Sequence, residues 1–212
     1  MKDTTRALFD ELLERYPSLT SIRSDIESAL EMLISVYKNG GKLLVCGNGG
    51  SAADSEHIVG ELMKSFMQKR AISTELYDKL ASFGEDGLHM REHLEGSLPA
   101  ISLTSHLSLS TAFANDSEPA LVFAQQLLGL GHSGDALIAI STSGNSKNCV
   151  LAATLAKAMG IKLIALTGAP KSKLSALADV SVRAPETETF KVQELHLPIY
   201  HAIAAALEKE FF

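Results

Sequence analysis

The amino-acid sequence predicts a single α/β domain, residues 1–212, in which a doubly wound sheet of five parallel strands is covered by helices. Five short runs, each apolar at consecutive positions, carry this prediction, because such runs are typical of parallel strands buried on both faces. The runs span residues 42–47, 98–105, 135–141, 162–168 and 180–185. Helix-like segments long enough for crossovers separate all of them but the last two, and this alternation favours a doubly wound sheet. No repeat, low-complexity tract or linker divides the chain.

Residues 1–40 are predicted to form N-terminal helices. Apolar residues recur there at spacings of three and four, the period of one helix face; they are Ile22, Ile26, Leu30, Leu33, Ile34 and Tyr37. The pattern stops at Asn39, Gly40 and Gly41, a combination that commonly ends a helix. A helical layer is therefore expected before the first strand.

A glycine turn follows the first predicted strand, in the stretch CGNGGSAADSEHIVGEL at residues 46–62. Ligands of open α/β sheets bind at the carboxyl ends of strands, where this turn is expected. Asn48, Gly49 and Ser51 lie in it, and glycine lets backbone N–H groups approach a ligand while the next helix points its positive end there. The alternative interpretation is an ordinary strand–helix turn in which Asn or Ser caps the helix.

Residues 65–97 are too long and too polar for an ordinary connection between a helix and a strand. The segment contains two glycines, Gly84 and Gly87, and two histidines, His89 and His93. We expect it to form an inserted helical arm, whose role the sequence leaves open.

A second loop with unusual chemistry, STSGNS at residues 141–146, follows the third predicted strand. It combines a glycine with four hydroxyl side chains, which can donate hydrogen bonds without a charge to desolvate; they belong to Ser141, Thr142, Ser143 and Ser146. Four hydroxyls exceed what a single helix cap needs. Neither loop matches the GxxxxGK[ST] or GxGxxG pattern, so a phosphomonoester on a small molecule is predicted rather than a nucleotide.

The helix after the first loop and the C-terminal helix carry a candidate metal site. His57 and Glu61 are four residues apart and share a helix face, about 9 Å beyond Ser51. Gln193 and His201 are eight apart on the last helix and share a broad face. Two imidazoles, a carboxylate and an amide oxygen could bind a borderline divalent metal such as zinc. The alternative is a surface pair, His57 with Glu61, and a core histidine at 201.

Composition limits the class of protein. The chain is 46% hydrophobic and 21% charged, with a net charge of −6, which argues against nucleic acid as the main partner. The first residues lack the apolar core of a signal peptide, and no apolar stretch reaches the length of a membrane span. The two cysteines, Cys46 and Cys149, show no CxxC spacing. These features predict a cytoplasmic protein with no disulfide framework and no membrane partner.

The loops and the His/Glu pattern occur together in a known family. The sequence resembles the sugar isomerase (SIS) domain family, and within it the phosphoheptose isomerases. The matching stretches are CGNGGSAADSEHIVGEL, LPAISLTS, STAFAND, DALIAISTSGNSKN, KLIALTG and QELHLPIYH, which cover most of residues 40–205. The combination of STSGNS, His-x-x-x-Glu after NGGS, and Gln with His eight residues later is specific.

The resemblance implies a role for each of these residues. The hydroxyls of residues 141–146 would hold a phosphate, and Asn48, Gly49, Ser51 and Gln193 would contact the sugar phosphate. Glu61 and His201 correspond to the acid/base pair of the family. The ligands of one zinc ion per site would be His57, Glu61, Gln193 and His201. A homotetramer with sites between subunits is also implied.

The implied reaction is the conversion of sedoheptulose 7-phosphate to D-glycero-D-manno-heptose 7-phosphate through an enediol. Ketose–aldose interconversion needs a base and an acid near neutral pKa, which Glu and His can supply. The chain departs from the family pattern at His106, at Phe190 and in the longer segment 65–97, which leaves a different sugar phosphate open. A non-catalytic module that binds a phosphosugar or docks a protein is the third possibility. Retention of Glu61 and His201 favours an enzyme.

Overall fold

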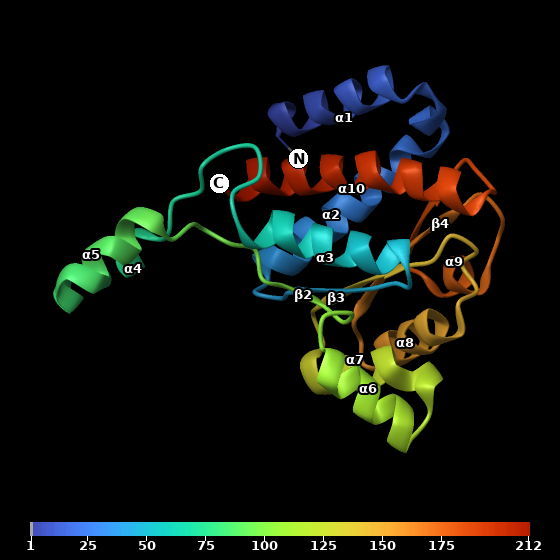
Figure 1. The fold of residues 1–212 in the computed structure, drawn as a ribbon. Helices are drawn as coiled ribbons and strands as arrows, with labels where there is room; N and C mark the ends of the chain where they lie inside the picture. The colour runs from blue at the N-terminus through green and yellow to red at the C-terminus, as the bar shows by residue number, and fades with distance from the viewer. Residues whose placement is uncertain (1) are drawn as a thin grey trace.

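Five parallel strands form the centre of the computed structural model, which describes residues 2–212 (Figure 1). In the order of the sheet they are β2 (Ala100–Ser102), β1 (Leu43–Cys46), β3 (Ala136–Ile140), β4 (Lys162–Gly168) and β5 (Val180–Ala184). Every neighbouring pair is parallel. The predicted α/β fold with a five-stranded parallel sheet is therefore confirmed.

Successive strand residues face opposite sides, so each strand contributes to two separate cores. In β1, Leu43 and Val45 pack on one side, whereas Leu44 and Cys46 pack on the other, and all four are fully buried. This double burial is why the strands are apolar at every position rather than at alternate ones.

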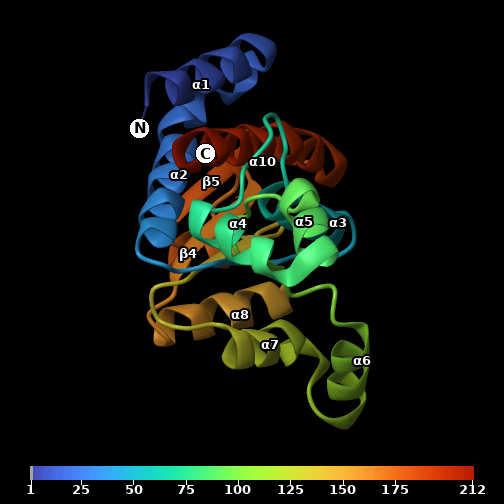
Figure 2. The same ribbon diagram turned by 90° about the vertical axis from the view of Figure 1, so that its left-hand side faces the viewer.

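Four helices build the first core: α1 (Asp3–Arg15), α2 (Arg23–Lys38), α3 (Gly50–Met63) and α10 (Thr189–Phe211). Figures 1 and 2 show α10 between the sheet and α1, which lies outermost. Between α1 and α2 the chain makes a 3₁₀ helix, η1 (Pro17–Ile22). The predicted apolar stripe is the buried face of α2, where Ile26, Leu30 and Leu33 are at most 1% exposed.

The second core is covered by α7 (Val122–Leu130), α8 (Lys147–Ala158) and α9 (Lys173–Leu177), while α6 (Leu107–Asp116) and η3 (Pro119–Leu121) connect β2 to α7. The five-residue helix α9 lies between β4 and β5, where the sequence pattern shows no helix-like segment. It is too short to display a helical period, and a reciprocal capping box between Ser172 and Ser175 begins it.

Residues 65–97 leave the body after α3 and form α4 (Thr74–Leu80), η2 (Ala81–Phe83) and α5 (Gly84–His93). In Figure 1 these helices, drawn in green, project away from the sheet and its helical layers, and Figure 2 views the molecule from the side on which they lie.

A buried ion pair fixes the base of the arm. Arg70 Nε lies 2.7 Å from Glu208 Oε1, and both side chains are fully buried. The guanidinium also donates to the carbonyls of Leu62 and Glu61 at the end of α3, at 2.7 and 2.8 Å. Glu208 in turn accepts backbone N–H bonds from residues 66–68. The pair thus joins the last turn of α3 to α10.

Candidate functional site

The sheet order places the two predicted loops side by side. β1 and β3 are neighbours, with Cys46 paired to Ala139 at their carboxyl ends. The helix after β1, α3, packs on the first core, whereas the helix after β3, α8, packs on the second. The connections therefore diverge between these strands, and such a divergence opens a crevice that binds ligands in α/β sheets.

A pair of amides joins the two loops across this crevice. Asn48 Nδ2 donates to Asn148 Oδ1 at 2.9 Å, and Asn148 Nδ2 donates back to Asn48 Oδ1 at 2.8 Å. Sequence reasoning selected Asn48 but missed Asn148, which lies just beyond STSGNS in the first turn of α8. Its position next to the STSGNS loop could have marked Asn148 as a candidate site residue. That it bonds Asn48 follows only from β1 and β3 being neighbours in the sheet.

The hydroxyls of the second loop are not used to cap α8. Ser146 occupies the cap position, yet its side chain bonds Ser141 Oγ at 2.9 Å and makes no capping bond. Ser143 Oγ accepts from the backbone N–H of Asn145 at 3.2 Å. Gly144 has φ +64°, and a Cβ there would lie 2.0 Å from Ser172 Oγ, so glycine is required. Hydroxyls and the start of α8 together make a site suited to an anion.

One turn of α3 meets α10 at the entrance to this crevice. Gln193 packs its side-chain amide against Gly50, where a Cβ would lie only 2.5 Å from Gln193 Nε2. Ser51 is buried in the same turn. Gln193 thus belongs with the glycine turn, about 10 Å along α3 from His57. This position suits contact with substrate, while its role as a metal ligand stays a prediction.

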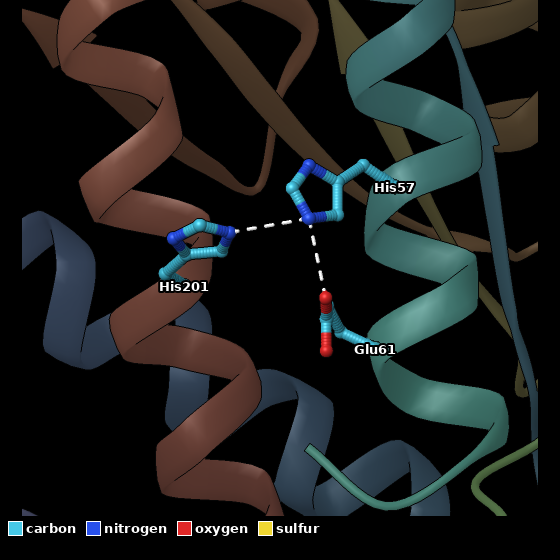
Figure 3. Close-up of side chains that lie close together, drawn as sticks. All are labelled: His57, Glu61 and His201. Atoms are coloured by element: carbon cyan, nitrogen blue, oxygen red, sulfur yellow. Dashed lines mark hydrogen bonds and ion pairs between the residues drawn. The ribbon is translucent and has the colours of Figure 1, made fainter. Parts of the chain in front are cut away.

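Figure 3 shows three of the predicted metal-ligating side chains converging from α3 and α10. His57 Nε2 lies 3.2 Å from Glu61 Oε1 and 3.4 Å from His201 Nε2. One potential ligand atom from each residue lies within 4.8 Å of the others. Glu61 Oε2 is buried and has no hydrogen-bond partner within residues 2–212. Three convergent donors with an unsatisfied carboxylate oxygen are suited to a divalent cation.

Two further side chains, which sequence reasoning missed, surround His57. Tyr200 Oη lies 3.0 Å from His57 Nδ1 and 3.2 Å from Asp54 Oδ1. Asp54 precedes His57 by three residues on α3, so helical spacing could have identified it. Tyr200 precedes His201 on α10, where its aromatic character alone resembles a core residue.

Burial changes the acidity of this cluster. It raises the pKa of Asp54, against the opposing effects of the Tyr200 hydrogen bond and of His57. It lowers the pKa of His201, and the charge of His57 acts in the same direction while Glu61 opposes both. His201 is therefore held towards its neutral form, in which an imidazole can accept a proton.

Comparisons with known proteins find relatives in both sequence and structure over most of the chain. SIS domain models match residues 100–208 and residues 9–82. The phosphoheptose isomerase of Akkermansia muciniphila is 33% identical over 201 residues, 95% of this chain and 93% of its own length. That of Aneurinibacillus thermoaerophilus is 38% identical over 187 residues, 88% of this chain and 82% of its own. The structure of phosphoheptose isomerase from Neisseria gonorrhoeae superposes with a TM-score of 0.74 at 30% identity, covering 98% of both chains.

None of the helices within residues 2–212 is both long and apolar enough to cross a membrane.

Proposed function

The chain belongs to the SIS domain family, on its phosphoheptose isomerase branch, and on this basis we propose that it interconverts sedoheptulose 7-phosphate and D-glycero-D-manno-heptose 7-phosphate through an enediol. One observation carries the proposal: a carboxylate and an imidazole, Glu61 and His201, meet about three turns along α3 from the glycine turn, whose Asn48 is bonded to the start of the helix that follows the STSGNS loop. His57, about 9 Å along α3 from Ser51, lies at about the length of an extended sugar phosphate.

The substrate phosphate binds the STSGNS loop in this proposal. Ser141, Thr142, Ser143 and Ser146 supply hydroxyl donors, and the N-terminus of α8 favours the negative charge. Asn48, Gly49, Ser51 and Gln193 contact the adjacent part of the sugar chain; all four come from the glycine turn or from the α10 residue packed against it. The opposite end of the sugar then reaches His57.

Glu61 and His201 divide the proton transfers between them. Isomerisation removes a proton from the carbon beside the carbonyl and returns it to the neighbouring carbon, with a further exchange between the two oxygens. We assign the role of the base that acts on carbon to Glu61, whose Oε2 is buried without a hydrogen-bond partner in residues 2–212. His201, whose pKa is lowered by burial, is available in its neutral form to exchange the oxygen-bound proton.

The same residues fit a metal ion, and zinc is the proposed cofactor. His57, Glu61 and His201 would hold it through atoms that already converge. The predicted fourth ligand, Gln193, is not part of this convergence, because its amide packs against Gly50 about 10 Å along α3 from His57. A bound zinc ion polarises the substrate carbonyl. Glu61 is proposed for both roles because its oxygens differ: Oε1 faces His57, whereas Oε2 has no hydrogen-bond partner among the described residues and lies 3.9 Å from Lys64 Nζ.

We also propose that the protein forms a homotetramer and is located in the cytoplasm. His201 also lines a cavity of about 310 Å³ between α1 and α10, beside the metal-ligating residues. This opening supports the expectation that a neighbouring subunit completes the site. Light scattering of the purified protein would measure the oligomer directly, and a monomer with full activity would contradict that expectation.

An isomerisation assay tests the proposed function. Purified protein is treated with chelator and given sedoheptulose 7-phosphate with and without added zinc. We expect aldose product that depends on zinc. No product from protein that still binds the sugar phosphate would instead favour a binding module or a different sugar. The arm at residues 65–97 and the exposed Phe190 at the start of α10 favour the different sugar as the second candidate.

A further inference from the structure

His57 is the most exposed member of the cluster, and the buried hydroxyl of Tyr200 lies against it. The His57 side chain is 42% exposed, against 13% for Glu61. Tyr200 is 3% exposed and places its hydroxyl between His57 Nδ1 and Asp54 Oδ1. We propose that Asp54 and Tyr200 are positioning residues that make His57 Nδ1 a hydrogen-bond donor and so aim His57 Nε2 at Glu61 and His201. This inference deepens the proposed metal site and rests on it.

The direction of the two hydrogen bonds follows from counting protons. A tyrosine hydroxyl has one proton to donate, and an ionised carboxylate can only accept. Asp54 Oδ2 is buried without a partner in the described part of the chain, so the Tyr200 bond is the one donor that its carboxylate receives there. A buried carboxylate without any donor is costly, which directs the Tyr200 proton to Asp54. Tyr200 Oη is then an acceptor toward His57.

His57 Nδ1 must therefore carry a proton, which it donates to Tyr200 Oη. Its other nitrogen, Nε2, is the atom that lies 3.2 Å from Glu61 and 3.4 Å from His201. A metal-ligating imidazole binds through one nitrogen while the other donates to an outer partner, which fixes the ring and its tautomer. The Asp54–Tyr200 pair supplies that outer partner. The opposite tautomer would turn a protonated nitrogen toward the proposed metal site.

Nitrogen NMR on histidine-labelled full-length protein tests the proton position without any turnover. The His57 signals are assigned by their loss in His57→Gln, and Nδ1 and Nε2 are distinguished by their couplings to the ring protons. We expect Nδ1 to be protonated in both the metal-free and the zinc-loaded protein. A wild-type His57 with Nδ1 unprotonated would overturn the proposal, whether or not the protein isomerises the sugar phosphate.

Zinc affinity measured by chelator competition tests the consequence. Tyr200→Phe should weaken zinc binding about 10–100-fold, the usual effect of removing an outer partner. Asp54→Asn should weaken it less, because an amide oxygen still accepts from Tyr200. The matched control is Tyr37→Phe, which removes the hydroxyl of another buried tyrosine, bonded to Pro99 O just before β2 and not to any residue of the cluster. It should leave zinc affinity unchanged.

Two outcomes would reject the positioning role. One is a zinc affinity in Tyr200→Phe within twofold of wild type; the other is an equal loss in Tyr37→Phe. Failure of wild-type protein to bind zinc would also reject it. If instead zinc affinity and the Nδ1 proton behave as expected while no aldose forms, the proposed substrate is wrong and the positioning role stands. If Tyr200→Phe does not fold, Asp54→Asn and the wild-type NMR measurement decide the question.

Discussion

The two ends of the proposed site are built in different ways, although α3 runs between them. At the loop end, the predicted ligand-binding groups of the loops come from two short segments, 48–51 and 141–146, and the backbone sets their positions. At the reactive end, side chains from α3 and α10 meet across about 140 residues of sequence. The loop end tolerates little change in backbone shape, whereas the reactive end depends on the orientation of individual side chains.

The substitution with the largest expected effect removes the proposed catalytic base and leaves the loop end intact. Glu61→Gln should lower kcat about 10²–10⁴-fold, because the base that acts on carbon is lost. Sugar-phosphate binding, measured by calorimetry, should persist because the STSGNS loop is untouched. Glu31→Gln, an exposed carboxylate on α2, is the matched control. Near-normal turnover of Glu61→Gln would remove Glu61 from the mechanism.

The second-largest expected effect is a pH dependence of stability that arises beneath the loop end of the site. His196 on α10 is fully buried and donates to Thr167 O beneath the loop end. Burial lowers its pKa to about 4, a shift that the Thr167 hydrogen bond opposes. The unfolded chain then binds one more proton than the folded chain between pH about 6.5 and 4, so stability is full above 6.5 and falls as pH drops.

The expected loss across that window is about 3 kcal/mol in the free energy of unfolding. Urea titrations at pH 7 and pH 4.5 measure it, and His196→Gln should flatten the profile. The control, His132→Gln, alters an exposed histidine and should leave the slope unchanged. A slope identical in wild type and His196→Gln would show that His196 does not carry this dependence.

A backbone substitution distinguishes the loop end from the reactive end. Gly144→Ala adds a Cβ 2.0 Å from Ser172 Oγ at a positive φ, so we expect about 2 kcal/mol of destabilisation and a large rise in KM. Gly129→Ala in α7, where a Cβ meets no atom within 4 Å, is the control and should not destabilise the protein. Equal unfolding free energies for the two variants would contradict the required left-handed backbone.

The substitution with the smallest expected effect removes one hydroxyl group from the STSGNS loop. Ser143→Ala should raise KM about tenfold with kcat nearly unchanged, because it removes one donor to the phosphate, worth about 1.4 kcal/mol. Steady-state kinetics gives both parameters. A fall in kcat without a change in KM would place Ser143 in the chemical step instead of in phosphate binding.

The sequence revealed most where function is encoded locally. Apolar runs marked all five strands because parallel strands are buried on both faces, and glycine with clustered hydroxyls marked the loops. Helical spacing paired His57 with Glu61. It could not show that Asn148 bonds Asn48, because that contact depends on which strands are neighbours.

The reactive end shows the limit of local patterns. Tyr200 resembles any core aromatic in the sequence, and Asp54 resembles a surface acid. Asp54 shares a face of α3 with His57, but the Tyr200 hydroxyl reaches both residues only because α3 and α10 pack together with a particular rotation about their axes. Arg70 likewise looks in the sequence like an ordinary cation in a polar segment. In the structure it is buried against Glu208 and donates hydrogen bonds to the carbonyl groups at the end of α3.

The sequence by itself determined the α/β class and the five strands, because these are set by the period of burial. It also predicted the two loops as ligand sites and the residue types for acid–base chemistry, because those predictions depend on turns and spacings within a few residues. Only the tertiary structure decided which side chains meet. It placed Gln193 at the glycine turn, His201 beside the pair of His57 and Glu61, and the Tyr200 hydroxyl between His57 and Asp54. The physical reason is that strand order and helix rotation, which join residues distant in sequence, follow from packing of the whole core rather than from any local pattern.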